Sequence, residues 1–188
     1  YASYAEGFTV PDVGRITRAI NRPGVAIDSF LDIAPIVSNN REIGIEVKRG
    51  PVDASTAYFW SSSDKGQLLI ANPGGIFDVQ RLRTEIQGLE VNLGVRLPLP
   101  GARLSIGYAH LSGRYDSDTP PDGIVDTDLD GTNISPDRLN LAASYDRGRW
   151  SARVQSQFFL SRTFKGKQRD PRNDFGGYTV VDGTIAYD

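Results

Sequence analysis

The sequence predicts an all-β protein, an antiparallel up-and-down transmembrane β-barrel with about eight strands in this chain. Two observations predict this fold class. Apolar and polar residues alternate with a period of two in segment after segment, whereas helical periodicity is weak. Long connections also alternate with short ones. The expected strands cover residues 1–5, 41–49, 55–61, 83–97, 102–115, 138–145, 149–163 and 177–187.

The alternation gives each expected strand one apolar and one polar face. Every second residue from Leu89 to Leu97 is aliphatic, and charged Glu90 and Arg96 lie on the opposite face. A charge that faces lipid is costly, so we expect the aliphatic stripe to face the membrane and the polar residues to face a hydrated lumen. The lumen-facing set is expected to include Glu90, Asn92, Arg96, Arg153, Gln155 and Gln157.

The connections support a membrane barrel. Long ones are expected at 6–40, 62–82, 116–137 and 164–176, and short ones near 50–53, 98–101 and 146–148. In a meander, all the long loops then lie at one end, as in outer-membrane barrels, whereas compact soluble domains seldom contain such loops. Tyr145 and Trp150 flank one short turn on the apolar face, as in an interfacial aromatic girdle. Two alternatives stay open: a self-contained eight-stranded outer-membrane barrel, and a soluble β-sandwich that acts as a binding module.

Composition argues against several functions. The net charge of -2 and the pI of about 5.5 make nucleic acid an improbable partner. There is no cysteine, and His110 is the only histidine, so thiolate and histidine chemistry is not expected. No nucleophile motif or phosphate loop is present, and we do not expect an enzyme. His110 falls on the outward-facing side of its strand, and we expect it near the outer interface.

One loop has a calcium-like pattern. The segment 116–137 contains seven aspartates, and Asp126, Asp128, Asp130 and Gly131 form D-x-D-x-D-G, with Asp137 at position twelve. Calcium binds several carboxylate oxygens, and glycine permits the sharp turn. Position twelve is normally a glutamate, however, and the flanking elements here are strands. The other interpretation is a solvated acidic loop.

Four segments resemble a known family. YASYAEGFTVPD (1–12) is similar to a strand and loop of TonB-dependent outer-membrane receptors, and NREIGIEVKRG (40–50) resembles their N-x-E-x-G strand. RTEIQGLEVNLGVRLP (83–98) resembles their I-x-G-x-E strand, and YTVVDGTIAYD (178–188) their Y-T-x-V-D strand. The four matches follow the family's order and are spread over the whole chain.

The resemblance implies a 22-stranded barrel in the outer membrane of Gram-negative bacteria, closed by an N-terminal plug and energised by the TonB complex. Within the family, the sequence resembles receptors for ferric siderophores, including the hydroxamate-citrate type represented by aerobactin. The expected partners are then a ferric siderophore, TonB through the plug, and outer-membrane lipid and lipopolysaccharide. No resident cofactor is expected. The plug, the TonB box and the terminal strands have no counterpart in the sequence, so residues 1–188 are expected to form about eight strands of the C-terminal half of the barrel domain.

Two basic clusters are candidates for contact with such a ligand. Ferric siderophores with free carboxylates are anionic, arginine binds carboxylates in a bidentate manner, and aromatic rings supply contact area. The candidate residues are Arg15, Arg18 and Arg22 in the first long connection, and Arg162, Lys165, Arg169 and Phe175 in the last. The alternative is that these charges are solvated or face lipopolysaccharide.

Overall fold

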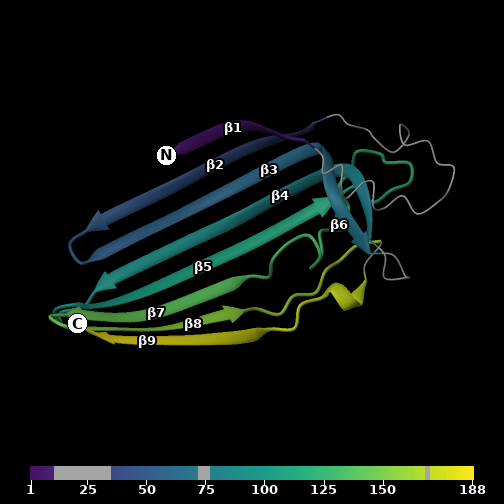
Figure 1. Ribbon diagram of the computed structural model, residues 1–188. Coiled ribbons are helices and arrows are strands. Elements are labelled where there is room, and N and C mark those ends of the chain that lie inside the picture. Colours follow the sequence, from purple (N-terminus) through teal and green to yellow (C-terminus); the bar gives the residue numbers. More distant parts are fainter. Residues whose placement is uncertain (11–34, 72–76, 168–169) are drawn as a thin grey trace.

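The computed structural model describes residues 1–10, 35–71, 77–167 and 170–188, which form one antiparallel sheet (Figure 1). Eight long strands follow one another in chain order across the sheet, and the two-residue β6 pairs with the end of β5. The strands are β1 (Ala2–Thr9), β2 (Ile36–Arg49), β3 (Val52–Ala71), β4 (Phe77–Arg96), β5 (Ala102–Tyr115), β6 (Thr127–Asp128), β7 (Arg138–Arg147), β8 (Trp150–Phe159) and β9 (Tyr178–Tyr187). A short 3-10 helix, η1, covers Pro171–Asn173.

The order of the strands confirms the predicted meander. The tight turns after β2, β4 and β7 lie together at one end of the sheet, and the described parts of the connections after β5 and β8 lie at the other (Figure 1). Gly50 and Gly148 have φ values of 58° and 63° in two of these turns, a conformation that glycine adopts without steric cost. The segment 116–137 and the segment after β8 therefore meet at the same end.

The register separates the two faces as the alternation predicted. Leu93 pairs with Ala54 on β3 and Ile106 on β5, and the same row continues to Leu141 on β7. We call this side the apolar face. Asn92 pairs with Ser55 and Gly107 on the other side, which we call the polar face. Because paired residues point to the same side of a sheet, the side chains of these two rows lie on opposite faces, one apolar and one polar.

The apolar face is exposed. Ile45, Ile106 and Val154 are 63%, 45% and 50% exposed, and the described residues form no second sheet that could cover them. The sandwich alternative therefore has no second layer among these residues. β1 and β9 lie at opposite edges and pair with β2 and β8, so the described strands do not close on themselves as the eight-stranded alternative requires. No helix among the described residues is long and apolar enough to span a membrane.

The predicted long connection at 62–82 is wrong. β3 and β4 stay paired from Val52 and Val95 up to Ala71 and Phe77, with an irregularity in β3 between Ser63 and Gly66. The run Ser61–Ser62–Ser63–Asp64–Lys65 has no apolar alternation, so sequence reading ended the strand there. Backbone pairing with β4 continues the strand regardless. β8 is also shorter than predicted and ends at Phe159.

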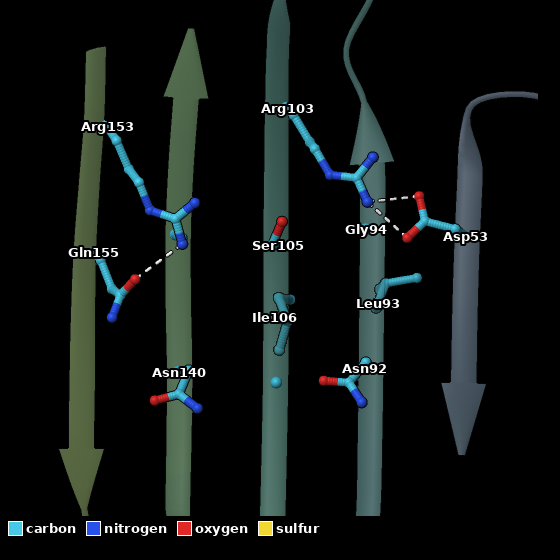
Figure 2. A pocket seen from close by; sticks show the side chains of 12 residues that line it. Asp53, Asn92, Leu93, Gly94, Arg103, Ser105, Ile106, Asn140, Arg153 and Gln155 are labelled. Carbon is cyan, nitrogen blue, oxygen red and sulfur yellow. Dashed lines mark hydrogen bonds and ion pairs between the residues drawn. The ribbon is translucent and has the colours of Figure 1, made fainter.

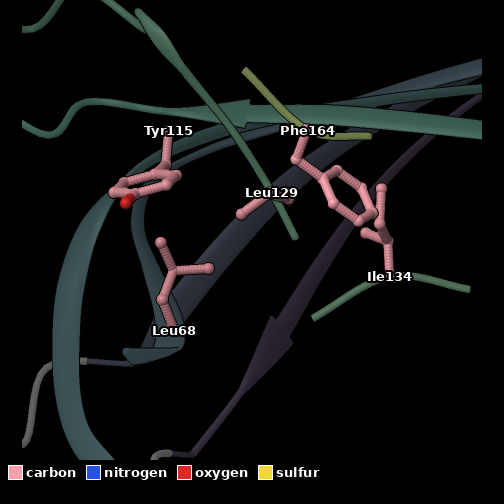
Figure 3. Close-up of a cluster of buried hydrophobic side chains, with 5 residues drawn as sticks. All are labelled: Leu68, Tyr115, Leu129, Ile134 and Phe164. Atoms are coloured by element: carbon pink, nitrogen blue, oxygen red, sulfur yellow. The ribbon is translucent and has the colours of Figure 1, made fainter. Parts of the chain in front are cut away.

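A small hydrophobic core lies at the long-connection end. Leu68 and Tyr115, from β3 and β5, are 5% and 7% exposed, and they belong to the same buried cluster as three loop residues (Figure 3). The loop residues are Leu129, Ile134 and Phe164. Leu82, Ile86, Leu111 and Phe175 pack around the cluster. The strand members of this cluster have the parity of the polar face, so that face becomes apolar where loops cover it.

Candidate functional site

Several hollows lie on the polar face, and the one at the long-connection end lies directly beside the loop core. It has a volume of about 500 Å³, within the usual range for a small-molecule site. We call it the aromatic pocket. Its strand residues include Phe59, Glu90, Arg138, Phe159 and Tyr178, and its loop residues include Gly131, Ile134, Ser135, Pro136 and Phe175.

Strand register places the aromatic rings of this pocket. Phe159 and Tyr178 are cross-strand partners, and their rings stack with centroids 4.4 Å apart and planes 14° apart. Phe59 pairs with Gly88 on β4. A Cβ at Gly88 would lie 2.5 Å from the Phe59 ring and 2.9 Å from the His110 carbonyl, so glycine provides the space for that ring. The result is a wall of aromatic contact area that an organic ligand can use.

Two opposite charges complete the aromatic pocket. Glu90, Ala109 and Arg138 occupy one row on β4, β5 and β7, so the carboxylate and the guanidinium are separated by one strand. Neither side chain has an ion-pair partner among the residues that the structure describes. The pocket therefore offers both a donor and an acceptor to a polar ligand.

A second hollow on this face lies nearer the tight turns and has a volume of about 320 Å³ (Figure 2). We call it the polar pocket. Arg103 on β5 reaches over β4 to Asp53 on β3, with one guanidinium nitrogen 2.6 Å from both carboxylate oxygens. Gly94 lies beneath this bridge, and a Cβ there would collide with the Arg103 guanidinium and the Asp53 carboxylate. The glycine thus allows an ion pair to cross an intervening strand.

Arg153 supplies the second guanidinium of the polar pocket. It donates to Gln155 at 2.9 Å and has no acidic partner among the described residues. Asn92 and Asn140 add amide groups to the same wall (Figure 2). Four of the predicted lumen-facing residues therefore line these two hollows, namely Glu90, Asn92, Arg153 and Gln155. The wall that they form can hydrogen-bond water or a hydrophilic solute.

Of the predicted ligand residues, Phe175 lies in the aromatic pocket, where it also packs edge-on to Phe164 with centroids 5.8 Å apart. Arg162 is mostly buried. Its guanidinium donates to the Leu111 carbonyl, lies 3.6 Å from Asp137 and covers the Phe164 ring at 5.2 Å. Those contacts hold the last connection against the sheet.

Of the remaining predicted ligand residues, Lys165 alone belongs to the part of the chain that the structure describes. Lys165 is exposed and does not line the aromatic or the polar pocket. Arg15, Arg18, Arg22 and Arg169 lie outside the described residues.

The four predicted calcium ligands do not converge. Asp128 lies in β6 and accepts from the Lys165 amide at 2.9 Å, and Asp130 accepts from the Thr132 amide and from Asn173. Asp126 bonds Ser117 and Lys167, and Asp137 bonds His110. Strand pairing of Thr127–Asp128 with β5 pulls the D-x-D-x-D-G segment into an extended path. A group of carboxylates close enough to share an ion occurs instead, among the described residues, at Asp116, Asp118 and Asp122.

His110 lies on the apolar-face parity above Leu104, Ile106 and Tyr108, as expected. Its Nδ1 is 2.8 Å from the Asp137 carboxylate, which also accepts from the Tyr108 hydroxyl at 3.4 Å. The histidine therefore takes part in a polar cluster at the end of the apolar face.

Sequence reasoning missed most of the aromatic pocket. Phe59 and Phe159 stand in their strands as ordinary apolar residues, and Tyr178 had been noted only as part of a family-like segment. Parity could have found them, because all three fall on the same side as Glu90 once the register is fixed. The register between distant strands was the missing information.

Comparison with known proteins identifies the fold. The family model for the TonB-dependent receptor-like β-barrel matches residues 1–188. Among solved structures, the copper transporter OprC is similar with a TM-score of 0.78 and 16% identity, over 100% of this chain and 28% of that one. The ferric-catecholate import receptor Fiu of E. coli K12 is similar with a TM-score of 0.61 and 20% identity, over 100% of this chain and 26% of that one.

The pyoverdine outer-membrane receptor FpvA of Pseudomonas aeruginosa PAO1, bound to pyoverdine, is similar with a TM-score of 0.55 and 20% identity, over 98% of this chain and 26% of that one. The chain thus spans about a quarter of the length of these structures. At such identities the structures establish the fold alone, whereas the family match covers every residue. The chain therefore belongs to the TonB-dependent receptor-like β-barrel family, whose members are transport receptors of the Gram-negative outer membrane.

Proposed function

We propose that this chain is part of the barrel of a receptor that takes up a ferric siderophore, with energy supplied by the TonB complex. The aromatic pocket is the observation that carries the proposal. It combines the stacked Phe159 and Tyr178 rings, the Phe59 ring and two charges without an ion-pair partner in the described part of the chain, at the end of the polar face that the loops cover. An organic iron chelate needs apolar contact area together with a few directed polar groups.

Bare copper is the second candidate, because OprC is named as a copper transporter and has the highest TM-score of the three structures described above. Copper(I) prefers thiolate and thioether ligands, and imidazole also suits copper. These 188 residues contain no cysteine, no methionine and one histidine. The side chains of this segment therefore favour an organic chelate over a bare copper ion.

The polar and apolar faces support the rest of the proposal. Arg103, Arg153 and the amides of Asn92 and Asn140 give the polar pocket a hydrophilic wall, as a hydrated lumen requires. The exposed apolar face suits contact with outer-membrane lipid, and lipopolysaccharide is the proposed neighbour at the loop end. A plug domain in the complete protein is the proposed connection to TonB.

Uptake by the full-length receptor tests this function. A strain without its own siderophore receptors would be given the gene, and transport of ⁵⁵Fe loaded on catecholate, hydroxamate and hydroxamate-citrate siderophores would be measured with and without TonB. We expect TonB-dependent uptake of at least one ferric siderophore. Uptake of copper salts without any iron chelate would instead support the copper function, and transport that persists without TonB would refute the energy source.

A pair of neighbouring residues tests the pocket. Phe159 faces the aromatic pocket, whereas Phe158 pairs with Leu139 on the apolar face. Phe159→Ala should weaken binding of the transported chelate by roughly tenfold, because an aromatic contact contributes about 0.5–1.5 kcal/mol beyond its buried area. Phe158→Ala should leave the affinity unchanged at equal receptor abundance. Equal affinities for both variants would exclude the aromatic pocket as the binding site.

A further inference from the structure

Two segments that are far apart in sequence form a joint structure over the end of the sheet. We call 116–137 and the described part of the last connection, 160–167 and 170–177, the cap loops. The Asp128 amide donates to the Lys165 carbonyl at 2.8 Å, and the Lys165 amide donates back to the Asp128 carboxylate at 2.9 Å. Leu129 and Phe164, one from each loop, are 1% and 2% exposed in the same core. The cap loops thus share both backbone pairing and a hydrophobic core.

A lysine in one cap loop bridges two aspartates in the other. Lys167 Nζ lies 2.7 Å from Asp118 Oδ1 and 2.6 Å from Asp126 Oδ2. Its backbone amide donates to the hydroxyl of Thr127, a residue only 2% exposed. Asp126 also accepts from Ser117, so these contacts converge on one carboxylate.

The electrostatics agree with this geometry. The Lys167 ammonium, with help from Ser117 and Thr127, holds the pKa of Asp126 well below its ordinary value. Asp118 and Asp126 together raise the pKa of Lys167. Both groups are therefore charged throughout the neutral range, and the lysine ammonium provides the positive charge for this part of the acidic loop.

Both cap loops also border the aromatic pocket. Ile134 and Pro136 line it from the first loop, and Phe175 lines it from the second. The loops touch at Gly131, where a Cβ would lie 2.5 Å from the Asn173 carbonyl and 3.2 Å from the Phe175 ring. A movement of one loop away from the pocket must therefore break contacts with the other.

We propose that the two cap loops act as one lid over the aromatic pocket and that Lys167, held between Asp118 and Asp126, is its clasp. The clasp joins the two loops so that they cover and uncover the pocket together, and its loss loosens both. The joint needs no divalent cation because the ammonium occupies the place between the carboxylates. This inference rests on the proposed function only in that a ferric siderophore is the ligand of the pocket. The clasp itself is a property of the loops.

Hydrogen exchange of the full-length receptor in lipid nanodiscs tests the clasp. Lys167→Gln should raise amide exchange in both cap loops together, by about two- to fivefold, the range expected for an exposed ion pair. Lys167→Arg should restore protection. Lys165→Gln is the matched control, because its ammonium has no partner among the described residues and its backbone bonds stay in place. Exchange in β7 and β8 should stay constant in all variants, which shows that the barrel is intact.

Several results would overturn the proposal. Faster exchange in only one cap loop would show that the loops do not open together, and an equal effect of Lys165→Gln would show that net charge alone matters. Loosening of the wild-type loops by EDTA, with recovery in calcium, would assign the clasp to a metal ion. If the Lys167→Gln variant fails to assemble, the wild-type receptor is measured in 1 M salt instead. The Debye length is then about 3 Å, so the salt should weaken the ion pairs of Lys167 and loosen both loops. Loop exchange is measured without any siderophore, so its outcome is independent of the uptake experiment.

Discussion

Replacing Leu93 by arginine tests the assignment of the two faces. Leu93 lies near the middle of the apolar stripe of β4, between Ala54 and Ile106 in its row. An arginine on the lipid side of a barrel costs about 2–4 kcal/mol at mid-depth. Each 1.4 kcal/mol is a factor of ten in an equilibrium constant. The equilibrium constant for folding in membranes should therefore be roughly 30- to 1000-fold smaller for Leu93→Arg than for the wild type.

The neighbouring residue provides the control. Asn92 has the opposite parity, borders the polar pocket and pairs with Gly107, which has no side chain. Asn92→Arg should change the free energy of unfolding by no more than about 0.5 kcal/mol, as surface substitutions usually do. Leu93→Ala separates loss of bulk from gain of charge and should cost much less than Leu93→Arg.

Equilibrium unfolding by guanidinium from lipid vesicles measures all three variants in the full-length receptor. The reasoning predicts a large loss of stability for Leu93→Arg alone. If Asn92→Arg and Leu93→Arg are equally destabilised, the faces are not distinguished by their environment and the assignment fails. A larger loss for Asn92→Arg would mean that the apolar face is turned away from lipid.

Three further predictions concern the glycine bridge and the cap loops. A double-mutant cycle should give a coupling energy of about 0.2–1 kcal/mol between Asp53 and Arg103, as for other exposed ion pairs. Gly94→Ala should abolish this coupling, and a coupling that persists would show that the bridge does not need the glycine. The pKa of Asp126 is depressed in the folded protein, so its contribution to lid closure is fully present above the ordinary pKa of 3.8 and is lost as the pH falls through the lower folded pKa. Amide exchange in the cap loops, corrected for the intrinsic rate, should therefore stay constant from pH 5 to 8. Loosening near pH 6 would contradict this. Leu129→Ala should cost the cap loops about 2–5 kcal/mol of local stability by hydrogen exchange and leave the strands unaffected, whereas a loss spread over the whole sheet would show that the loop core is not a separate unit.

Periodicity was sufficient to predict the strands and their faces because both depend on local sequence. The segment from Leu89 to Leu97 alternates without interruption, and its partners Leu104 and Ile106 on β5 keep the same alternation. The local pattern therefore indicates which face of each strand is apolar. The extension of β3 depends on pairing with β4 and has no local signal between Ser61 and Lys65. The aromatic pocket is likewise invisible locally, because it needs Phe59 and Phe159 to meet from strands that are far apart in sequence.

The aspartates of the acidic loop show why one sequence pattern can suggest two structures. Asp116 accepts from the Asp118 amide, Asp122 from the Ile124 amide and Asp130 from the Thr132 amide, each two residues further along the chain. Aspartate stabilises turns in this way, and the spacing D-x-D arises equally from successive turns and from a calcium loop. The two cases differ in what the remaining lone pairs face. In a calcium loop they would converge on one point, whereas here those of Asp126 face Lys167 and those of Asp130 face Asn173, both in the other cap loop. The aspartates therefore shape the first cap loop and bind it to the second, so the loop with the calcium-like pattern and the loop with the second basic cluster are parts of one structure.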